Sequence, residues 1–215
     1  MKIIRYGITL KRLKKNDIEL VRHWRNDKKI SQHMFYKGEI TKKMQREWFA
    51  SIDNDQNYFF LILHKKSPVG LINISSIDWE NKTAYSGLFI YDDKFLSTDV
   101  PVMSSLAMLD VFFVLLGMET VYAKVKGDNK VAHRYNTSLG FKRTKKIELG
   151  LGYEYTLTKK NYLKSAKHLR NAAIRLKGNA TQIHFYKKYK PDVWVMQQLM
   201  QTKKENLKLL SIKQT

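Results

Sequence analysis

One segment near the middle of the chain has the clearest boundaries and limits the possible folds most. Asp99 stands where a helix N-cap belongs, Pro101 falls in the first turn, and Gly117 marks the stop. The residues between them are mostly apolar, which predicts a buried helix. Strand-like residues occur on both sides, at Ala84–Tyr91 and Thr120–Val125. This order predicts a mixed α/β domain in which helices cover a sheet.

The rest of the chain extends the same pattern. Ahead of the buried helix we expect an edge strand, two helices with Thr41 as the N-cap of the second, and two strands of an antiparallel meander, at Ile8–Arg12, Asn16–Arg25, Thr41–Ile52, Tyr58–His64 and Val69–Ile77. After Thr120–Val125 come a helix at Lys130–Ser138 and a closing strand at Tyr153–Thr158. Strand, helix and strand with a short return predict a right-handed βαβ unit with two parallel strands.

Length and charge divide the chain into a core and an appendage. A chain of 215 residues holds one well-buried domain, which we place at residues 1–163. From Lys164 to Thr215 twelve Lys and Arg residues stand against two acids, so we expect a basic, mainly helical C-terminal extension. The formal net charge of the whole chain is +21, which predicts an anionic partner.

Several classes of site and location are made improbable by what the sequence lacks. The chain has no cysteine, which excludes disulfides and thiol nucleophiles and suits a cytoplasmic protein. No pair of histidines has the spacing of metal ligands, so we expect no metal. The first fifteen residues lack the apolar run of a signal peptide.

The basic extension leaves two readings open. Lysine-rich helices are commonly only solvated faces. Alternatively, its apolar residues interleave with lysines as in a helix that binds an anionic membrane surface or an acidic acyl carrier protein, at Val193–Met196, Leu199-Met200 and Leu207–Ile212 with Lys203, Lys204, Lys208 and Lys213. We find no nucleic-acid-binding motif, so a nucleic-acid partner is not expected.

A family likeness rests on two groups of ordered residues. The first is Asn129, Ala132 and Gly140-Phe141, within the stretch NKVAHRYNTSLGF. The second lies in the N-terminal half and comprises Trp24-Arg25-Asn26, Met34, Ile40-Thr41, Gln45 and Trp48-Phe49. In this order the residues resemble the GCN5-related N-acetyltransferase (GNAT) superfamily, in its ribosomal-protein and amino-sugar branch. Within that branch the chain resembles members that acetylate a UDP-linked 4-amino-4,6-dideoxy sugar in pseudaminic acid synthesis.

The resemblance implies a GNAT fold, with a mostly antiparallel mixed sheet, one splayed parallel strand pair and helices on both faces. The splaying strands would be Ser86–Tyr91 and Thr120–Val125, whose free edge takes the pantetheine arm of acetyl-CoA or another thioester donor. The helix beginning near Val100 points its N-terminus at the same crevice and favours a diphosphate there. The residues implied to bind the donor are Phe89, Ile90, Tyr91, Ser97, Thr98, Val102, Asn129 and Asn136.

The chain departs from the family pattern at three places. The segment Lys94–Pro101 has no glycine where bare backbone usually contacts the diphosphate. Tyr85 stands where a strand glutamate is usual, so no carboxylate base is evident. Asn136 stands where a tyrosine acid is usual, one residue after Tyr135. We therefore expect catalysis by positioning and electrostatics, with Tyr85, Tyr135, Asn136 and His33 as the candidate catalytic side chains.

The acceptor side is implied by the N-terminal half, with Trp24, Arg25, Asn26, His33, Tyr36 and Asn73 as candidate substrate-binding residues. Alternatively, Trp24-Arg25-Asn26 is only a helix end that packs its indole, and His33 and Tyr36 belong only to a solvated loop. The leading expectation is an N-acyltransferase for an amino sugar, nucleotide-linked, in surface glycan synthesis. Acetylation of a protein N-terminus or lysine is the second reading. A non-catalytic anion-binding module on the same scaffold is the third.

Overall fold

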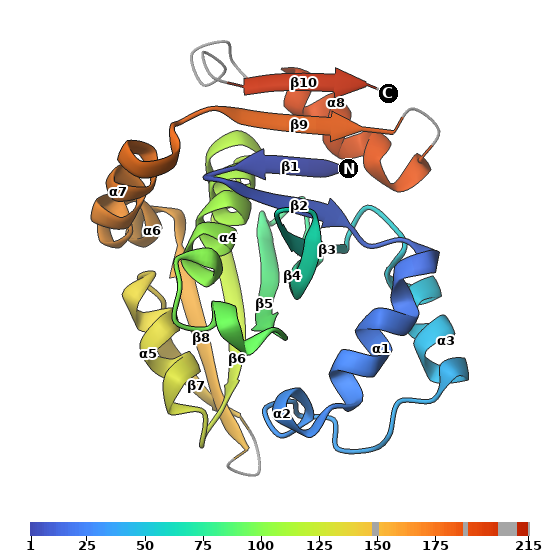
Figure 1. The fold of residues 1–215 in the computed structure, drawn as a ribbon. Helices are drawn as coiled ribbons and strands as arrows, with labels where there is room; N and C mark the ends of the chain where they lie inside the picture. The colour runs from blue at the N-terminus through green and yellow to red at the C-terminus, as the bar shows by residue number, and fades with distance from the viewer. Residues whose placement is uncertain (148–150, 187–188, 202–209, 215) are drawn as a thin grey trace.

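The computed structural model describes residues 1–147, 151–186, 189–201 and 210–214, shown in Figure 1. The described residues form one ten-stranded sheet in the order β10-β9-β1-β2-β3-β4-β5-β6-β8-β7. The strands are β1 (Lys2–Arg5), β2 (Ile8–Arg12), β3 (Tyr58–His64), β4 (Ser67–Asp78), β5 (Thr83–Ile90), β6 (Thr120–Lys126), β7 (Lys142–Ile147), β8 (Gly152–Thr158), β9 (Thr181–Phe185) and β10 (Leu210–Gln214).

Helices cover both faces of this sheet. They are α1 (Ile18–Asn26), α2 (Lys28–Ser31), α3 (Lys42–Ile52), α4 (Val100–Leu109), α5 (Lys130–Ser138), α6 (Lys159–Ser165), α7 (Lys167–Lys177) and α8 (Val193–Gln201). Alternate residues of β3 show the two layers, because Phe60 packs with α4 in the larger core and Leu61 packs with α1 in the smaller one. The predicted α/β fold class is confirmed.

The caps expected from sequence are present. The Thr41 hydroxyl accepts a hydrogen bond from the Met44 amide at the start of α3. Gly117 adopts a φ of +71° after the central helix, a conformation that glycine takes without strain. At the start of α4 the Asp99 side chain makes no capping bond, and the Thr98 hydroxyl accepts from the Val100 amide instead. Asp99 itself forms an ion pair with Lys177 at 3.1 Å.

The predicted parallel strand pair is β5 and β6, joined by α4, and β9 with β10 forms a second parallel pair. The β5–β6 ladder contains only three residue pairs, and the last of these is Tyr85 with Tyr122. Beyond that pair the two strands part, as the predicted splay requires. The backbone of Ser86–Ile90 pairs with β4 on one side and has no pairing with β6 on the other.

The predicted parallel unit over Thr120–Val125 and Tyr153–Thr158 is wrong. Strands β6 and β8 are antiparallel, with Tyr122 opposite Thr156. An unpredicted strand, β7, lies between α5 and β8 in the chain. The chain turns back after β7, so β8 runs antiparallel to both β7 and β6. Its sequence KRTKKI has almost no apolar residue, because β7 is an exposed edge strand whose side chains face solvent.

Strand β2 has its predicted bounds but is not an edge strand. Strand β1 pairs with it through a tight turn at Tyr6 and Gly7, both of which have positive φ. The C-terminal segment then adds β9 beside β1 and β10 beside β9. In Figure 1 the orange β9 and red β10 lie next to the blue β1.

The C-terminal segment packs on the core through α8 as well. Val195 and Leu199 of α8 are buried, and the Trp194 ring lies 4.1 Å from that of Trp79. The predicted amphipathic segment Leu207–Ile212 lies partly outside the described residues, and Lys203, Lys204 and Lys208 lie wholly outside them. The described residues Leu210–Gln214 form a strand. Within the described parts of the chain, no helix has both the length and the apolar character needed to cross a bilayer.

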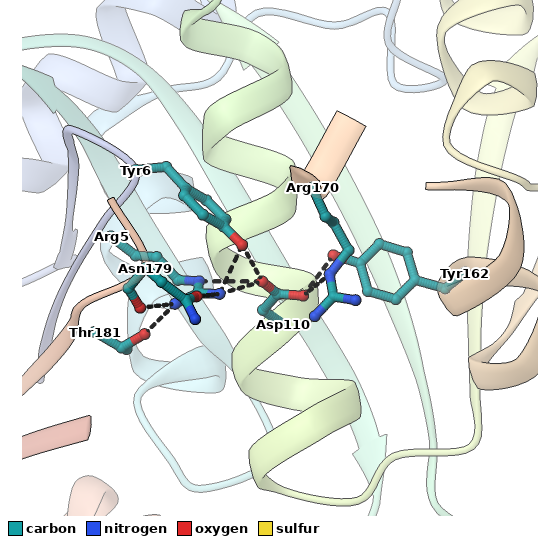
Figure 2. Close-up of polar contacts among 7 residues, drawn as sticks. All are labelled: Arg5, Tyr6, Asp110, Tyr162, Arg170, Asn179 and Thr181. Atoms are coloured by element: carbon teal, nitrogen blue, oxygen red, sulfur yellow. Dashed lines mark hydrogen bonds and ion pairs between the residues drawn. The ribbon is translucent and has the colours of Figure 1, made fainter. Parts of the chain in front are cut away.

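A buried carboxylate ties the C-terminal segment to the central helix (Figure 2). Asp110 stands where α4 changes to the π-helical turn η3 (Asp110–Leu115) and is 4% exposed. It accepts hydrogen bonds from Arg5, Tyr6, Tyr162 and Arg170 at 2.7 to 3.0 Å. Burial, followed by the nearby Asp110 charge, raises the pKa of Tyr6 to about 12, so this phenol remains a donor. The cluster joins β1, α4, α6 and α7.

Candidate active site

A cavity of about 740 Å³ passes through the sheet where β5 and β6 part. Its walls come from the α1–α2 end and the loop after it on one face, and from α4 and α5 on the other. The predicted site residues that line it are Arg25, His33, Tyr36, Asn73, Phe89, Ile90, Asn129, Tyr135 and Asn136. The cavity therefore brings both predicted sides of the site together.

Asn129 has the position predicted for a donor-binding residue and also caps a helix. Its Oδ1 accepts a hydrogen bond from the Ala132 amide at 3.0 Å, which starts α5. Because Asn129 lines the cavity beside the free edge of β5, a pantetheine arm along that edge would lie within its reach. The residues present fit this part of an acyl-CoA.

The start of α4 fits the diphosphate less well. Pro101 has no amide hydrogen, and the Val100 amide is already bonded to the Thr98 hydroxyl. Ser97, Thr98 and Val102 do not line the cavity, and the Thr98 hydroxyl donates to the Phe95 carbonyl at 2.8 Å. The negative charge of Asp99 is offset by Lys177. The α4 terminus thus offers an anion fewer free amides than a glycine-rich loop would.

Tyr135 lines the cavity, but its phenol is bonded to α4. The hydroxyl donates to the Pro101 carbonyl at 2.8 Å and lies 2.7 Å from the Ser105 hydroxyl. Burial raises the pKa of Tyr135 well above 10, so the group remains protonated. Asn136 likewise uses its amide within α5, donating to the Ala132 carbonyl at 2.8 Å.

We expect Tyr135→Phe to reduce stability more than catalysis. The change removes two hydrogen bonds between α5 and α4, which contribute about 1 kcal/mol each to the free energy of unfolding. Urea unfolding and initial rates of acyl transfer measure the two effects. A fall in rate of about 100-fold or more with unchanged stability would show instead that the phenol supplies the leaving-group proton.

Two of the predicted acceptor residues, Trp24 and Asn26, and the predicted donor residue Tyr91 have structural contacts instead. Trp24 is buried and stacks on Tyr91 with ring centres 5.2 Å apart. Asn26 donates to the Ile40 carbonyl and accepts from the Ile40 amide, both at 2.9 Å, which closes the loop over residues 27–39. Neither Trp24, Asn26 nor Tyr91 lines the cavity.

Arg25 is the predicted acceptor residue with the clearest charge. Its guanidinium lies 5.0 Å from the Trp48 ring centre, and burial lowers its pKa from the ordinary value. No ion pair joins it to a carboxylate among the described residues. Lys29, Lys124 and Lys126 also line the cavity. None of the three was predicted as a site residue, because the direction of each side chain depends on how α2 and β6 are placed in the fold.

Tyr85 lies at the last pair before the strands part, two residues before Gly87 and on the same face of β5. It does not itself line the cavity, but its hydroxyl donates to Glu154 Oε2 at 3.0 Å. Glu154 was not predicted as a site residue, because it comes from β8 on the far side of β6. Only knowledge of the register between β6 and β8 would have placed Glu154 beside Tyr85.

Asn73 lies opposite Gly87 in the β4–β5 ladder and lines the cavity. Its Nδ2 donates to the Ser75 hydroxyl at 3.0 Å, which directs its Oδ1 toward Gly87. A Cβ at Gly87 would lie 2.8 Å from that oxygen. The glycine therefore leaves the Asn73 carbonyl oxygen free to accept a hydrogen bond from a bound amine. The described residues hold no group of three or more potential metal ligands.

Comparison with known proteins agrees with this geometry. Residues 8–142 match the family model described as an acetyltransferase (GNAT) domain. A sequence comparison with curated proteins finds no match. The solved structures compared below share 20% identity or less with the chain, so they bear on the fold alone.

Three of these structures illustrate the range of relatives. An apo nucleotide-linked sugar GNAT, FdhC, has a TM-score of 0.66 at 20% identity over 79% of this chain and 97% of its own. The spermidine N-acetyltransferase of Vibrio cholerae in complex with CoA and spermine has 0.64 at 17%, over 73% and 98%. A domain from Methanocaldococcus jannaschii DSM 2661 has 0.62 at 20%, over 70% and 97%.

Proposed function

Since this chain belongs to the GNAT acetyltransferase family, we propose that it transfers an acyl group from acyl-CoA to the amine of a nucleotide-linked sugar. The family assignment carries the acetyltransferase activity. The nature of the acceptor is our proposal, and the charge of the cavity is the observation that supports it.

The cavity wall is cationic. Arg25, Lys29, Lys124 and Lys126 line it, against the one lining carboxylate of Asp93, which lies 3.5 Å from Lys29. Asp128, outside the lining, pairs with Lys126 at 3.4 Å, so the wall keeps a net positive charge. A polyamine acceptor is itself a polycation and would be repelled by such a wall. An acceptor that joins its amine to a diphosphate has the complementary charge, as in the solved neighbour described as a nucleotide-linked sugar GNAT.

Arg25 is the best-placed anchor for the acceptor phosphates. Contact with Trp48 holds the guanidinium, and its planar fork can bind phosphate oxygens through two parallel hydrogen bonds. Partial burial strengthens such a contact, because less water competes for the charge. His33 and Tyr36, on the loop between α2 and α3, also line the cavity.

The residues of the chain position the reaction. The bound acyl-CoA supplies an acyl thioester. The free edge of β5 and the Asn129 side chain hold its arm, and the Asn73 carbonyl oxygen orients the acceptor amine. Such positioning turns a bimolecular encounter into a local reaction, which contributes several powers of ten to the rate.

The charge argument is tested by Arg25→Ala. We expect the KM for a UDP-linked amino sugar to rise about tenfold to a hundredfold, because a hydrogen bond to a charged group contributes about 1.5–3 kcal/mol. The KM for the same amino sugar without the nucleotide should change little.

Lys43→Ala is the control, since Lys43 is a cation on the exposed surface of α3, away from the cavity. Equal effects of Arg25→Ala on both sugars would contradict a phosphate contact. Acylation of a protein N-terminus or lysine in preference to any sugar would favour the second reading of the sequence.

A further inference from the structure

The carboxylate of Glu154 lies beside the point where the splayed strands part. Tyr85, Tyr122 and Lys124 belong to β5 and β6, and Glu154 to β8. In the ladders Tyr85 is opposite Tyr122, whereas Glu154 is opposite Lys124, two residues further toward the open end of the splay. The Tyr85 phenol thus crosses β6 diagonally to reach Glu154 Oε2 at 3.0 Å.

This diagonal contact brings the phenol toward the cavity. The Nζ atom of Lys124 lies 5.0 Å from the Tyr85 ring centre, and Lys124 lines the cavity. Gly87, the next residue of β5 on the same face, also lines it and has no side chain to separate Tyr85 from an acceptor. The Tyr85–Glu154 pair therefore lies beside two residues of the cavity lining, Gly87 and Lys124.

Resting on the proposed function, we propose that Glu154, acting through the Tyr85 hydroxyl, accepts the proton that the acceptor ammonium must lose before it attacks the thioester. Tyr85 receives the proton at its oxygen and passes its own hydroxyl proton to Glu154 Oε2. The ammonium becomes a neutral amine, the carboxylate becomes a carboxylic acid, and the phenol is unchanged. The pair supplies the base that strand β5 itself lacks.

The charged and titratable neighbours of Glu154 are consistent with this role. Lys124 on β6 and Lys145 on β7 are its ladder partners. The Tyr85 hydroxyl on β5 donates to it, and the Tyr122 ring on β6 lies 5.3 Å from the Tyr85 ring, centre to centre. Burial, followed by the bond to Glu154, raises the pKa of Tyr85, which keeps the phenol protonated in its resting form. A protonated phenol between an ammonium and a carboxylate can relay a proton in one direction without accumulating charge.

The test compares two acceptors that differ in whether a proton must leave. A primary alkylamine or an amino sugar is protonated near neutral pH, whereas hydroxylamine is already neutral. For Glu154→Gln we expect kcat/KM with the protonated amine to fall about 100-fold, within the range for a general base. The loss should diminish as pH rises and the free amine becomes abundant. Acylation of hydroxylamine should stay within a few-fold of wild type, and Tyr85→Phe should behave similarly.

Glu119→Gln is the matched control, because Glu119 is an exposed carboxylate next to β6 that pairs with Lys159 at 3.9 Å and does not line the cavity. It should leave both reactions unchanged. The proposal is overturned if Glu154→Gln acylates the protonated amine as well as wild type does, or if it loses both acceptors equally, which would indicate a structural role. Failure of the sugar proposal is distinct, since wild type would then acylate the alkylamine but no nucleotide-linked sugar.

Discussion

Replacing Asp110 with alanine is expected to lower the free energy of unfolding by about 3–5 kcal/mol, the usual cost of removing one partner from a buried ion pair. The carboxylate accepts from Arg5, Tyr6, Tyr162 and Arg170 (Figure 2). Without it the guanidinium of Arg5, which is 8% exposed, loses its only ion-pair partner among the described residues. Because a typical domain is stable by about 5–15 kcal/mol, the variant approaches the limit of folding.

Asp99→Ala is the matched control for this prediction. Asp99 stands at the other end of the same helix and also pairs with a cation, Lys177, but both side chains are more than a third exposed. An exposed pair contributes only about 0–1 kcal/mol. Thermal unfolding should therefore show a fall in Tm on the order of 10 °C for Asp110→Ala and little change for Asp99→Ala. Similar shifts for both variants would contradict the assigned role of the buried cluster.

The second large effect concerns activity. Gly87→Val is expected to reduce kcat/KM on the order of 100-fold, because it fills the cavity between the splayed strands. Its Cβ would lie 2.8 Å from Asn73 Oδ1, so the amide that orients the acceptor must move. Displacement of a positioned group by about 1 Å can cost this much in rate.

Stability should change much less in this variant, since Gly87 is exposed to the cavity and the obstructing atom belongs to a side chain. Gly87→Ala adds only the Cβ and should give a smaller loss of rate in the same direction. Initial-rate measurements with circular dichroism on both variants provide the comparison. A fully active Gly87→Val protein would mean that the reaction takes place elsewhere.

Local signals in the sequence predicted the parts of the fold that depend on neighbours along the chain. Thr41 caps α3, Gly117 ends the central helix, and β2 and β3 have their predicted bounds. These features follow from side-chain chemistry within one or two turns. The splay of β5 from β6 came from the family resemblance and is confirmed by the ladder.

Features that depend on distant partners could not be predicted in this way. Strand β7 carries the charges of an exposed edge, so it lacks the apolar alternation that marks a strand. Asp110 looked like one polar residue within an apolar helix, because its partners come from β1, α6 and α7. Glu154 escaped notice for the same reason, since its contact with Tyr85 crosses an intervening strand.

The candidate site was predicted in part. The cavity includes Arg25, His33, Asn73 and Asn129 from the sequence-based set, whereas Trp24 and Asn26 belong to the packing of α1 and its loop. Residue type alone does not show whether a side chain lines the cavity or packs within the fold. The direction of the side chain relative to the sheet decides which of the two it does.

An acyl-transfer site with a cationic acceptor wall selects its acceptor by charge, and a competition assay measures that selection. Purified protein is given acetyl-CoA with equal concentrations of a UDP-linked amino sugar and spermidine, and the acetylated products are measured by mass spectrometry. The net positive charge of the wall, to which Arg25 and Lys124 contribute without an ion pair among the described residues, predicts acetylation of the nucleotide sugar, with a preference that weakens as salt is added. Preferential acetylation of spermidine, or no acetyl transfer to the sugar, would contradict a site of this kind.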